Sequence, residues 1–132
     1  MLLLHRLIRL LESNSFRNAI HLSNPKYQKR YNLNIKQIYE WDNRKAQINL
    51  AKHKVGFDEG ETIFDDPFLV TYIDELHSEQ EDRFISIGMS KNERILLVVH
   101  VERLETADFT LIRIISCRKA TPPERRLYEE SK

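Results

Sequence analysis

Basic residues at the ends of β-rich segments are the side chains in this chain best suited to chemistry. Five of them fall in the C-terminal half: Arg83, Arg103, Arg113, Arg118 and Lys119. A guanidinium on a sheet is costly to desolvate, and its fork of donors matches a phosphate group. Because neighbouring strands lie about 4.8 Å apart, such residues can converge on one patch. The pattern therefore favours a phosphate-binding surface built from several arginines.

Taken singly, each arginine has a simpler structural interpretation. Arg113 lies between two isoleucines, and Arg103 ends the apolar run LLVVHVER. Glu102 or Asp108 could neutralise either guanidinium at a strand end. It is the number of basic residues at strand ends that favours a phosphate as their common partner.

Lys52 and His53 are the candidates for proton transfer. A histidine near neutral pH can take a proton from a hydroxyl or give one to a leaving group. A histidine at the C-terminal end of a helix is also favoured by the helix macrodipole, without any catalytic role. Spacing alone favours the second interpretation, and both stay open.

The acidic residues Glu61, Asp65 and Asp66 could bind a divalent metal. An Asp-Asp-Pro sequence after a helix is first of all a turn signature, and no histidine stands at ligand spacing. Neither GxGxxG nor GxxxxGK[ST] occurs among the three glycines. The sequence therefore predicts neither a metal nor a cofactor.

Length and composition indicate one compact domain. The chain has 132 residues, 41% of them hydrophobic, and a single cysteine, which excludes an intramolecular disulfide. No apolar run approaches the roughly 20 residues needed to cross a bilayer. These features predict a reduced, cytoplasmic protein without a membrane partner.

Charge is unevenly distributed along the chain. Residues 1–36 hold seven bases and one acid, and residues 37–82 hold twelve acids and four bases. The basic segment starts with leucines at helical spacing and continues into an Asn- and Ser-rich stretch. We predict an N-terminal extension over residues 1–37, partly helical or disordered, and a domain over residues 38–132. A transit peptide is a weaker interpretation of the same basic segment.

Local signals predict the order of the elements. A strand is expected at 38–41, then a helix from the N-cap Asp42 to about Lys54 with Gly56 as its stop. A short helix opened by Asp58 ends before Asp65. Four β-rich segments follow, at 68–73, 83–89, 94–102 and 109–116.

A capping signature closes the chain, because Thr121, Pro122 and Glu124 fit the N-cap, N1 and N3 positions of a helix. The whole order predicts an α+β fold. Its N-terminal helices are expected to pack on an antiparallel meander of four to five strands, followed by a C-terminal helix.

Several motifs, in this order, resemble the BrnT family of toxins from bacterial type II toxin–antitoxin systems. The resemblance spans residues 38–130 and includes Trp41-Asp42, Lys52-His53, Asp66-Pro67 and the run Arg113-Ile114-Ile115-Ser116 with Arg118-Lys119-Ala120. It implies a RelE-like fold and a metal-independent endoribonuclease that cuts RNA and arrests translation. It also implies a BrnA-type antitoxin, a ribbon-helix-helix protein that masks the toxin and brings it to operator DNA.

RNA cleavage of this kind uses the substrate's own 2′-hydroxyl as nucleophile. We expect three arginines, Arg83, Arg103 and Arg113, to clamp the phosphate and stabilise its transition state. Arg118 and Lys119 are expected to bind RNA. His53 or Lys52 would move the proton.

Two residues depart from the family pattern. Cys117 stands where a small residue such as alanine is common, and Gly60 replaces a usual helix former. We expect Gly60 to weaken its helix by up to about 1 kcal/mol relative to alanine.

Two other functions stay open at this point. An inactive relative could serve only as an antitoxin- or DNA-binding module. Alternatively, Glu61, Asp65 and Asp66 could support a metal-dependent nuclease.

Overall fold

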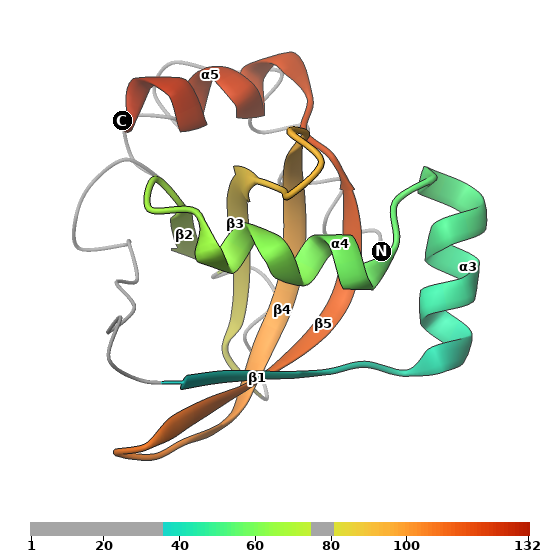
Figure 1. Cartoon of the computed structure of the whole chain (residues 1–132), viewed down its shortest axis with the longest axis vertical. Coiled ribbons are helices and arrows are strands. Elements are labelled where there is room, and N and C mark those ends of the chain that lie inside the picture. The colour runs from blue at the N-terminus through green and yellow to red at the C-terminus, as the bar shows by residue number, and fades with distance from the viewer. Residues whose placement is uncertain (1–35, 75–80) are drawn as a thin grey trace.

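The computed structural model describes residues 36–74 and 81–132 and shows, over these residues, an α+β fold with a five-stranded sheet (Figure 1). The elements are, in order, β1 (Lys36–Glu40), α3 (Asn43–His53), α4 (Phe57–Glu61), the 3-10 helix η2 (Thr62–Asp65), β2 (Val70–Ile73), β3 (Arg83–Met89), β4 (Ile95–Glu105), β5 (Phe109–Lys119) and α5 (Pro122–Glu130). The predicted α+β class is confirmed. The predicted N-terminal extension lies, up to residue 35, outside the described residues.

The sheet is mixed, with strand order β1-β5-β4-β3-β2. Each of β2, β3, β4 and β5 pairs antiparallel with its sequence neighbour, whereas β1 pairs parallel with β5. The prediction of a wholly antiparallel sheet is therefore wrong at β1. The physical reason is the long connection after β1. Helices α3, α4 and η2 carry the chain from β1 to β2 at the opposite edge, so no tight turn forces β1 into an antiparallel pair.

Both faces of the sheet carry an apolar cluster. On β4, Leu96 and Val98 belong to a cluster with residues of α4 and η2, while Leu97 and Val99 belong to one with Leu127 and Tyr128 of α5. This alternation follows the two-residue period of a strand. In Figure 1, α4 crosses in front of β3, β4 and β5, and α5 lies at one end of the sheet. We call the two sides the α4 face and the α5 face.

Helix α3 begins and ends close to the predicted positions, Asp42 and about Lys54, but the residue that stops it differs from the prediction. Asp42 is its N-cap, and the Asp42 Oδ1 accepts a hydrogen bond from the Lys45 backbone N–H at 3.1 Å. Its C-cap is Lys54, in the left-handed region with φ 61°, and not Gly56. Gly56 instead serves as the N-cap of α4, where its conformation is extended. The left-handed turn is closed by the Lys54 N–H, which donates to the carbonyl of Leu50 at 2.9 Å.

The Asn49 side chain ties α3 to the sheet by hydrogen bonds. Asn49 accepts a hydrogen bond from the Cys117 backbone N–H at 3.2 Å and donates to the Cys117 carbonyl at 2.8 Å. The register of β1 on β5 ends at Arg113, so Cys117 lies beyond the reach of β1. The Asn49 side chain therefore supplies the two bonds that a neighbouring strand would otherwise make there.

The C-terminal helix α5 confirms the predicted capping box. Thr121 is its N-cap, with Pro122 at the start of the helix. The Glu124 Oε1 accepts a hydrogen bond from the Thr121 N–H at 2.7 Å. The same glutamate has a second function, described below, that the capping signature did not reveal.

The two departures from the family pattern contact each other. A Cβ at Gly60 would lie 2.9 Å from the Cys117 Sγ, which is too close for an ordinary contact. Gly60 therefore makes room in α4 for a cysteine on β5. Burial raises the pKa of the Cys117 thiol to about 12, so we assign this cysteine to packing and not to nucleophilic chemistry.

This contact predicts that the two positions are coupled in stability. Gly60→Ala alone should lower the free energy of unfolding by about 1–2 kcal/mol, because overpacking against the sulfur exceeds the gain in helix propensity. In the double variant with Cys117→Ala the clash is gone, and stability should return to the level of Cys117→Ala or above. Urea unfolding of all four proteins measures the coupling. Strictly additive effects would show that the sulfur does not restrict position 60.

Candidate phosphate-binding site

Two of the predicted arginines lie in one row across the sheet. Arg83 of β3 is in register with Val101 of β4, Val101 with Arg113 of β5, and Arg113 with Glu40 of β1. Directly opposed residues project from the same face of a sheet, here the α5 face. Arg83 and Arg113 are two strands apart, about 10 Å between Cα atoms. We call Arg83, Val101, Arg113 and Glu40 the arginine row.

Glu40 is the carboxylate of the arginine row. The Arg113 Nη1 lies 3.5 Å from the Glu40 Oε1, and the two side chains are 31% and 39% exposed. The hydrogen bond from Lys45 N–H lowers the pKa of Asp42, and the positive charge of Arg113 lowers it further. A long, partly exposed ion pair of this kind contributes about 0–1 kcal/mol to stability. A phosphate can therefore replace Glu40 as the partner of Arg113 at little cost.

Arg103 lies at the end of the β3–β4 ladder. It occupies the irregular position between Glu102 and Leu104, where the β4–β5 register shifts. Its Nη1 donates to the Glu81 Oε2 at 3.0 Å, and its side chain is 45% exposed. Because irregular positions redirect side chains, we place Arg103 beside the arginine row and not within it. Its exposed ion pair with Glu81 is weak.

Arg118 and Lys119 are not brought to the arginine row. The Arg118 guanidinium donates to both carboxylate oxygens of Glu124, at 2.7 and 2.8 Å, beneath α5. Arg118 pairs with Leu97 of β4, whereas the arginine row crosses β4 at Val101. Leu97 and Val101 are four residues apart, or about 13 Å along the strand. The Arg118 side chain is only 11% exposed and pairs with the fully buried Glu124, so we assign Arg118 a structural role. Lys119 is exposed at the end of β5.

Lys52 and His53 also lie away from the arginine row. They lie at the C-terminal end of α3, whereas Asp42, the N-cap at the other end, lies close enough to Arg113 to interact with its charge. His53 is eleven positions beyond Asp42, a length of about 16 Å along the helix. Both side chains have interaction partners within the fold. The structure thus separates the predicted proton-transfer pair from the predicted phosphate clamp.

The acidic residues considered for metal binding have other surroundings. The Asp66 carboxylate accepts hydrogen bonds from the backbone N–H groups of Phe68 and Met89 and from the Tyr128 hydroxyl, at 2.9, 2.7 and 2.6 Å. These bonds tie the turn after η2 to β3 and α5, which is a structural function. Partial burial raises the pKa of Glu61. Over residues 36–74 and 81–132, no cluster of three or more His, Cys, Asp or Glu side chains could hold a metal ion.

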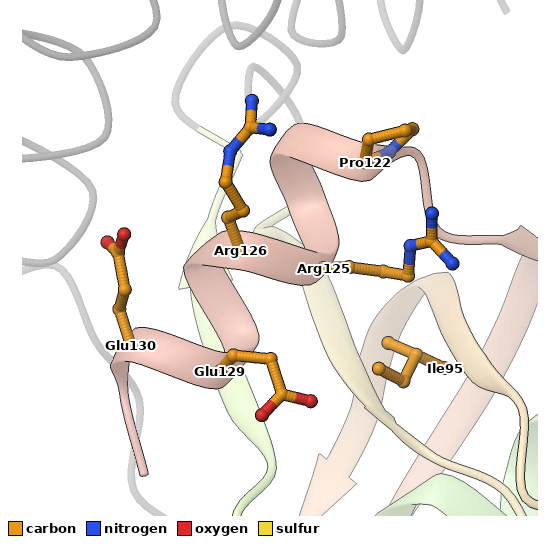
Figure 2. Close-up of a pocket in the computed structure, with 6 residues that line it drawn as sticks. All are labelled: Ile95, Pro122, Arg125, Arg126, Glu129 and Glu130. Atoms are coloured by element: carbon orange, nitrogen blue, oxygen red, sulfur yellow. The ribbon is translucent and has the colours of Figure 1, made fainter.

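A pocket of about 510 Å³ lies beside α5 (Figure 2). It is lined by Ile95, Pro122, Arg125, Arg126, Glu129 and Glu130. Ile95 begins β4, six residues or about 20 Å from Val101. The lining charges are of both signs, so the pocket lacks the single-sign character of a phosphate site, and it lies far from the arginine row.

Comparison with known proteins identifies the family. The sequence model described as the ribonuclease toxin BrnT of type II toxin–antitoxin systems matches residues 41–124, a range that includes Arg83, Arg103 and Arg113. The chain belongs to the BrnT family. The solved structures include the ribonuclease toxin BrnT of Brucella abortus, 24% identical, with a TM-score of 0.43, over 65% of this chain and 97% of that one. No curated protein matches the chain.

Sequence reasoning missed two residues of this BrnT-family chain. Glu40 was predicted only as part of a strand, because its contact with Arg113 depends on the parallel pairing of β1 with β5. Asn49 was not assigned a role, because its hydrogen bonds to Cys117 join segments 68 residues apart and no pattern within α3 indicates them. No described helix is long and apolar enough to cross a membrane.

Proposed function

We propose that this chain is the endoribonuclease of a toxin–antitoxin pair and that it binds the scissile phosphate of RNA at the arginine row. The register that aligns Arg83, Arg113 and Glu40 on one face of the sheet is the observation that carries the proposal. Two guanidiniums about 10 Å apart at the Cα atoms reach one phosphate from two sides. Membership in a ribonuclease toxin family supports the same substrate class.

The proposed reaction is metal-independent. The ribose 2′-oxygen attacks the adjacent phosphorus while its proton passes to a carboxylate or another base. The bond from phosphorus to the 5′-oxygen breaks, and that oxygen takes a proton from solvent. The products are a 2′,3′-cyclic phosphate and a 5′-hydroxyl. Arg83 and Arg113 stabilise the extra negative charge on phosphorus in the transition state, with Arg103 at the border of the site.

We assign the proton acceptor to Glu40 in place of His53 or Lys52. The Glu40 carboxylate lies 3.5 Å from the Arg113 guanidinium and is half-exposed, so a ribose hydroxyl can approach it. When phosphate displaces Glu40 from Arg113, the carboxylate remains beside the reacting group as a free acceptor. His53 and Lys52 lie at the far end of α3, about 16 Å away along the helix.

The proposed partner is a BrnA-type antitoxin with a ribbon-helix-helix fold, which masks the toxin and brings it to operator DNA. Free toxin then cleaves RNA in the cytoplasm and arrests translation. We also propose that the fold is RelE-like, since helices precede a set of sequential antiparallel strands.

Expression without an antitoxin should arrest bacterial growth, and the purified chain should cleave RNA equally well with and without EDTA. Cleaved ends should carry 2′,3′-cyclic phosphate. Cleavage that EDTA abolishes would support the metal-dependent alternative. A folded chain that neither arrests growth nor cleaves RNA would support the alternative of an inactive binding module.

A further inference from the structure

Helix α3 has almost no buried face. Of its eleven residues, all described, only Asn49 is buried, and that residue is polar. An isolated helix of this length is marginal in water, so helices normally depend on a packed apolar stripe. Here only the small side chain of Ala46 packs on the core, whereas the two large aliphatic residues are exposed, Ile48 at 58% and Leu50 at 51%.

The same helix is strongly basic. Residues 43–54 contain four Lys or Arg residues and no acid: Arg44, Lys45, Lys52 and Lys54. Arg44 and Lys54 are exposed, and neither forms an ion pair with any carboxylate in the described part of the chain. On a helical wheel, Gln47 and Ala51 face outward between Lys54 and Arg44, and Leu50 and Ile48 lie on the two opposite edges of this outward strip.

We infer that this outward strip of α3 is the docking surface for an acidic, aliphatic segment of the antitoxin. The basic residues of this strip, Arg44 and Lys54, complement acidic side chains and steer their approach. The exposed anchors are aliphatic, and bases of RNA stack on aromatic side chains, so the strip fits a protein better than a nucleic acid. The inference rests on the proposed neutralisation by an antitoxin, and it does not depend on the arginine row.

The test measures binding of the antitoxin, defined as the co-encoded protein that suppresses growth arrest. The double variant Ile48→Asp with Leu50→Asp should bind it at least about 30-fold more weakly than the unmodified chain, as loss of both exposed aliphatic anchors predicts. Phe68→Asp is the matched control, because Phe68 is an exposed apolar residue, 50% accessible, outside α3. This control should bind within about twofold.

A second measurement uses the unmodified full-length chain and so does not depend on how the variant folds. Amide hydrogen exchange over residues 43–54 should slow about tenfold or more when the antitoxin binds. Unchanged exchange in a saturated complex overturns the inference. So does a folded double variant that keeps its antitoxin affinity, including one that loses RNA affinity instead.

The outcome is separable from that of the proposed function. If the chain binds the antitoxin through α3 and does not cleave RNA, the inference stands and the enzyme assignment fails. If Arg44→Glu weakens binding about tenfold in low salt and much less in 0.5 M salt, the basic residues of the strip act electrostatically, as inferred.

Discussion

Replacing Arg113 by alanine is expected to reduce RNA cleavage by about 100- to 1000-fold, the loss typical of removing one donor that stabilises a transition-state charge. The side chain is 31% exposed and its contact with Glu40 is long, so the variant should fold normally. Single-turnover cleavage of an end-labelled RNA, with circular dichroism as the check on folding, measures the effect.

Variants of the neighbouring residues locate the effect in the arginine row. Arg83→Ala should cause a loss of the same order, and Arg103→Ala a smaller one. Arg125→Ala is the matched control, since Arg125 is an exposed arginine on α5, and it should cleave normally. Glu40→Gln should lower the cleavage rate, because an amide cannot accept the proton of the 2′-hydroxyl as a carboxylate does. Full activity in both Arg83→Ala and Arg113→Ala would remove the basis of the proposed site.

Replacing Glu124 by alanine is expected to lower the free energy of unfolding by about 3–5 kcal/mol, the loss seen when one partner of a buried ion pair is removed. Glu124 is fully buried and binds both terminal nitrogens of Arg118. It also caps α5 through the Thr121 N–H. The substitution therefore leaves a buried guanidinium without its carboxylate and an orphaned N–H group. Urea unfolding measures the change.

Two further proteins decide what Arg118 does. Glu129→Ala, at an exposed position of the same helix, should change the free energy of unfolding by less than about 0.5 kcal/mol. The double variant Arg118→Met with Glu124→Leu removes both charges and should regain most of the stability lost in Glu124→Ala. This double variant should also cleave RNA at the normal rate if Arg118 is structural. Greatly weakened RNA binding by a folded double variant would show that Arg118 contributes to binding the substrate.

Signals confined to a few residues predicted the structure well. The N-cap Asp42 and the box of Thr121, Pro122 and Glu124 act within one helical turn, so the sequence shows both partners. The strand at 83–89 was placed correctly for the same reason, since its β-rich composition is a local signal. Strand edges were less accurate, and β5 runs three residues beyond the predicted end.

What sequence reasoning missed depends on contacts between distant segments. The parallel pairing of β1 with β5 joins residues about 70 positions apart, and no local pattern distinguishes it from an antiparallel pairing. Glu40 could not be assigned to the site without that pairing. The sequence does not distinguish Arg113 from Arg118, since both are basic residues of the same β-rich segment. In the structure Arg118 binds Glu124 under α5, whereas Arg113 pairs with Glu40 in the arginine row.

The parallel pairing of β1 with β5 has a consequence for the synthesis of the protein. Residues 36–40 have to wait for residues 109–113 before they gain their strand partner, so closure of this loop comes late in folding. A growing chain on the ribosome therefore holds Glu40 and Arg83 before Arg113 exists to join them. Under the proposed function, we expect chains that stop before residue 113 not to cleave RNA, because their site lacks Arg113.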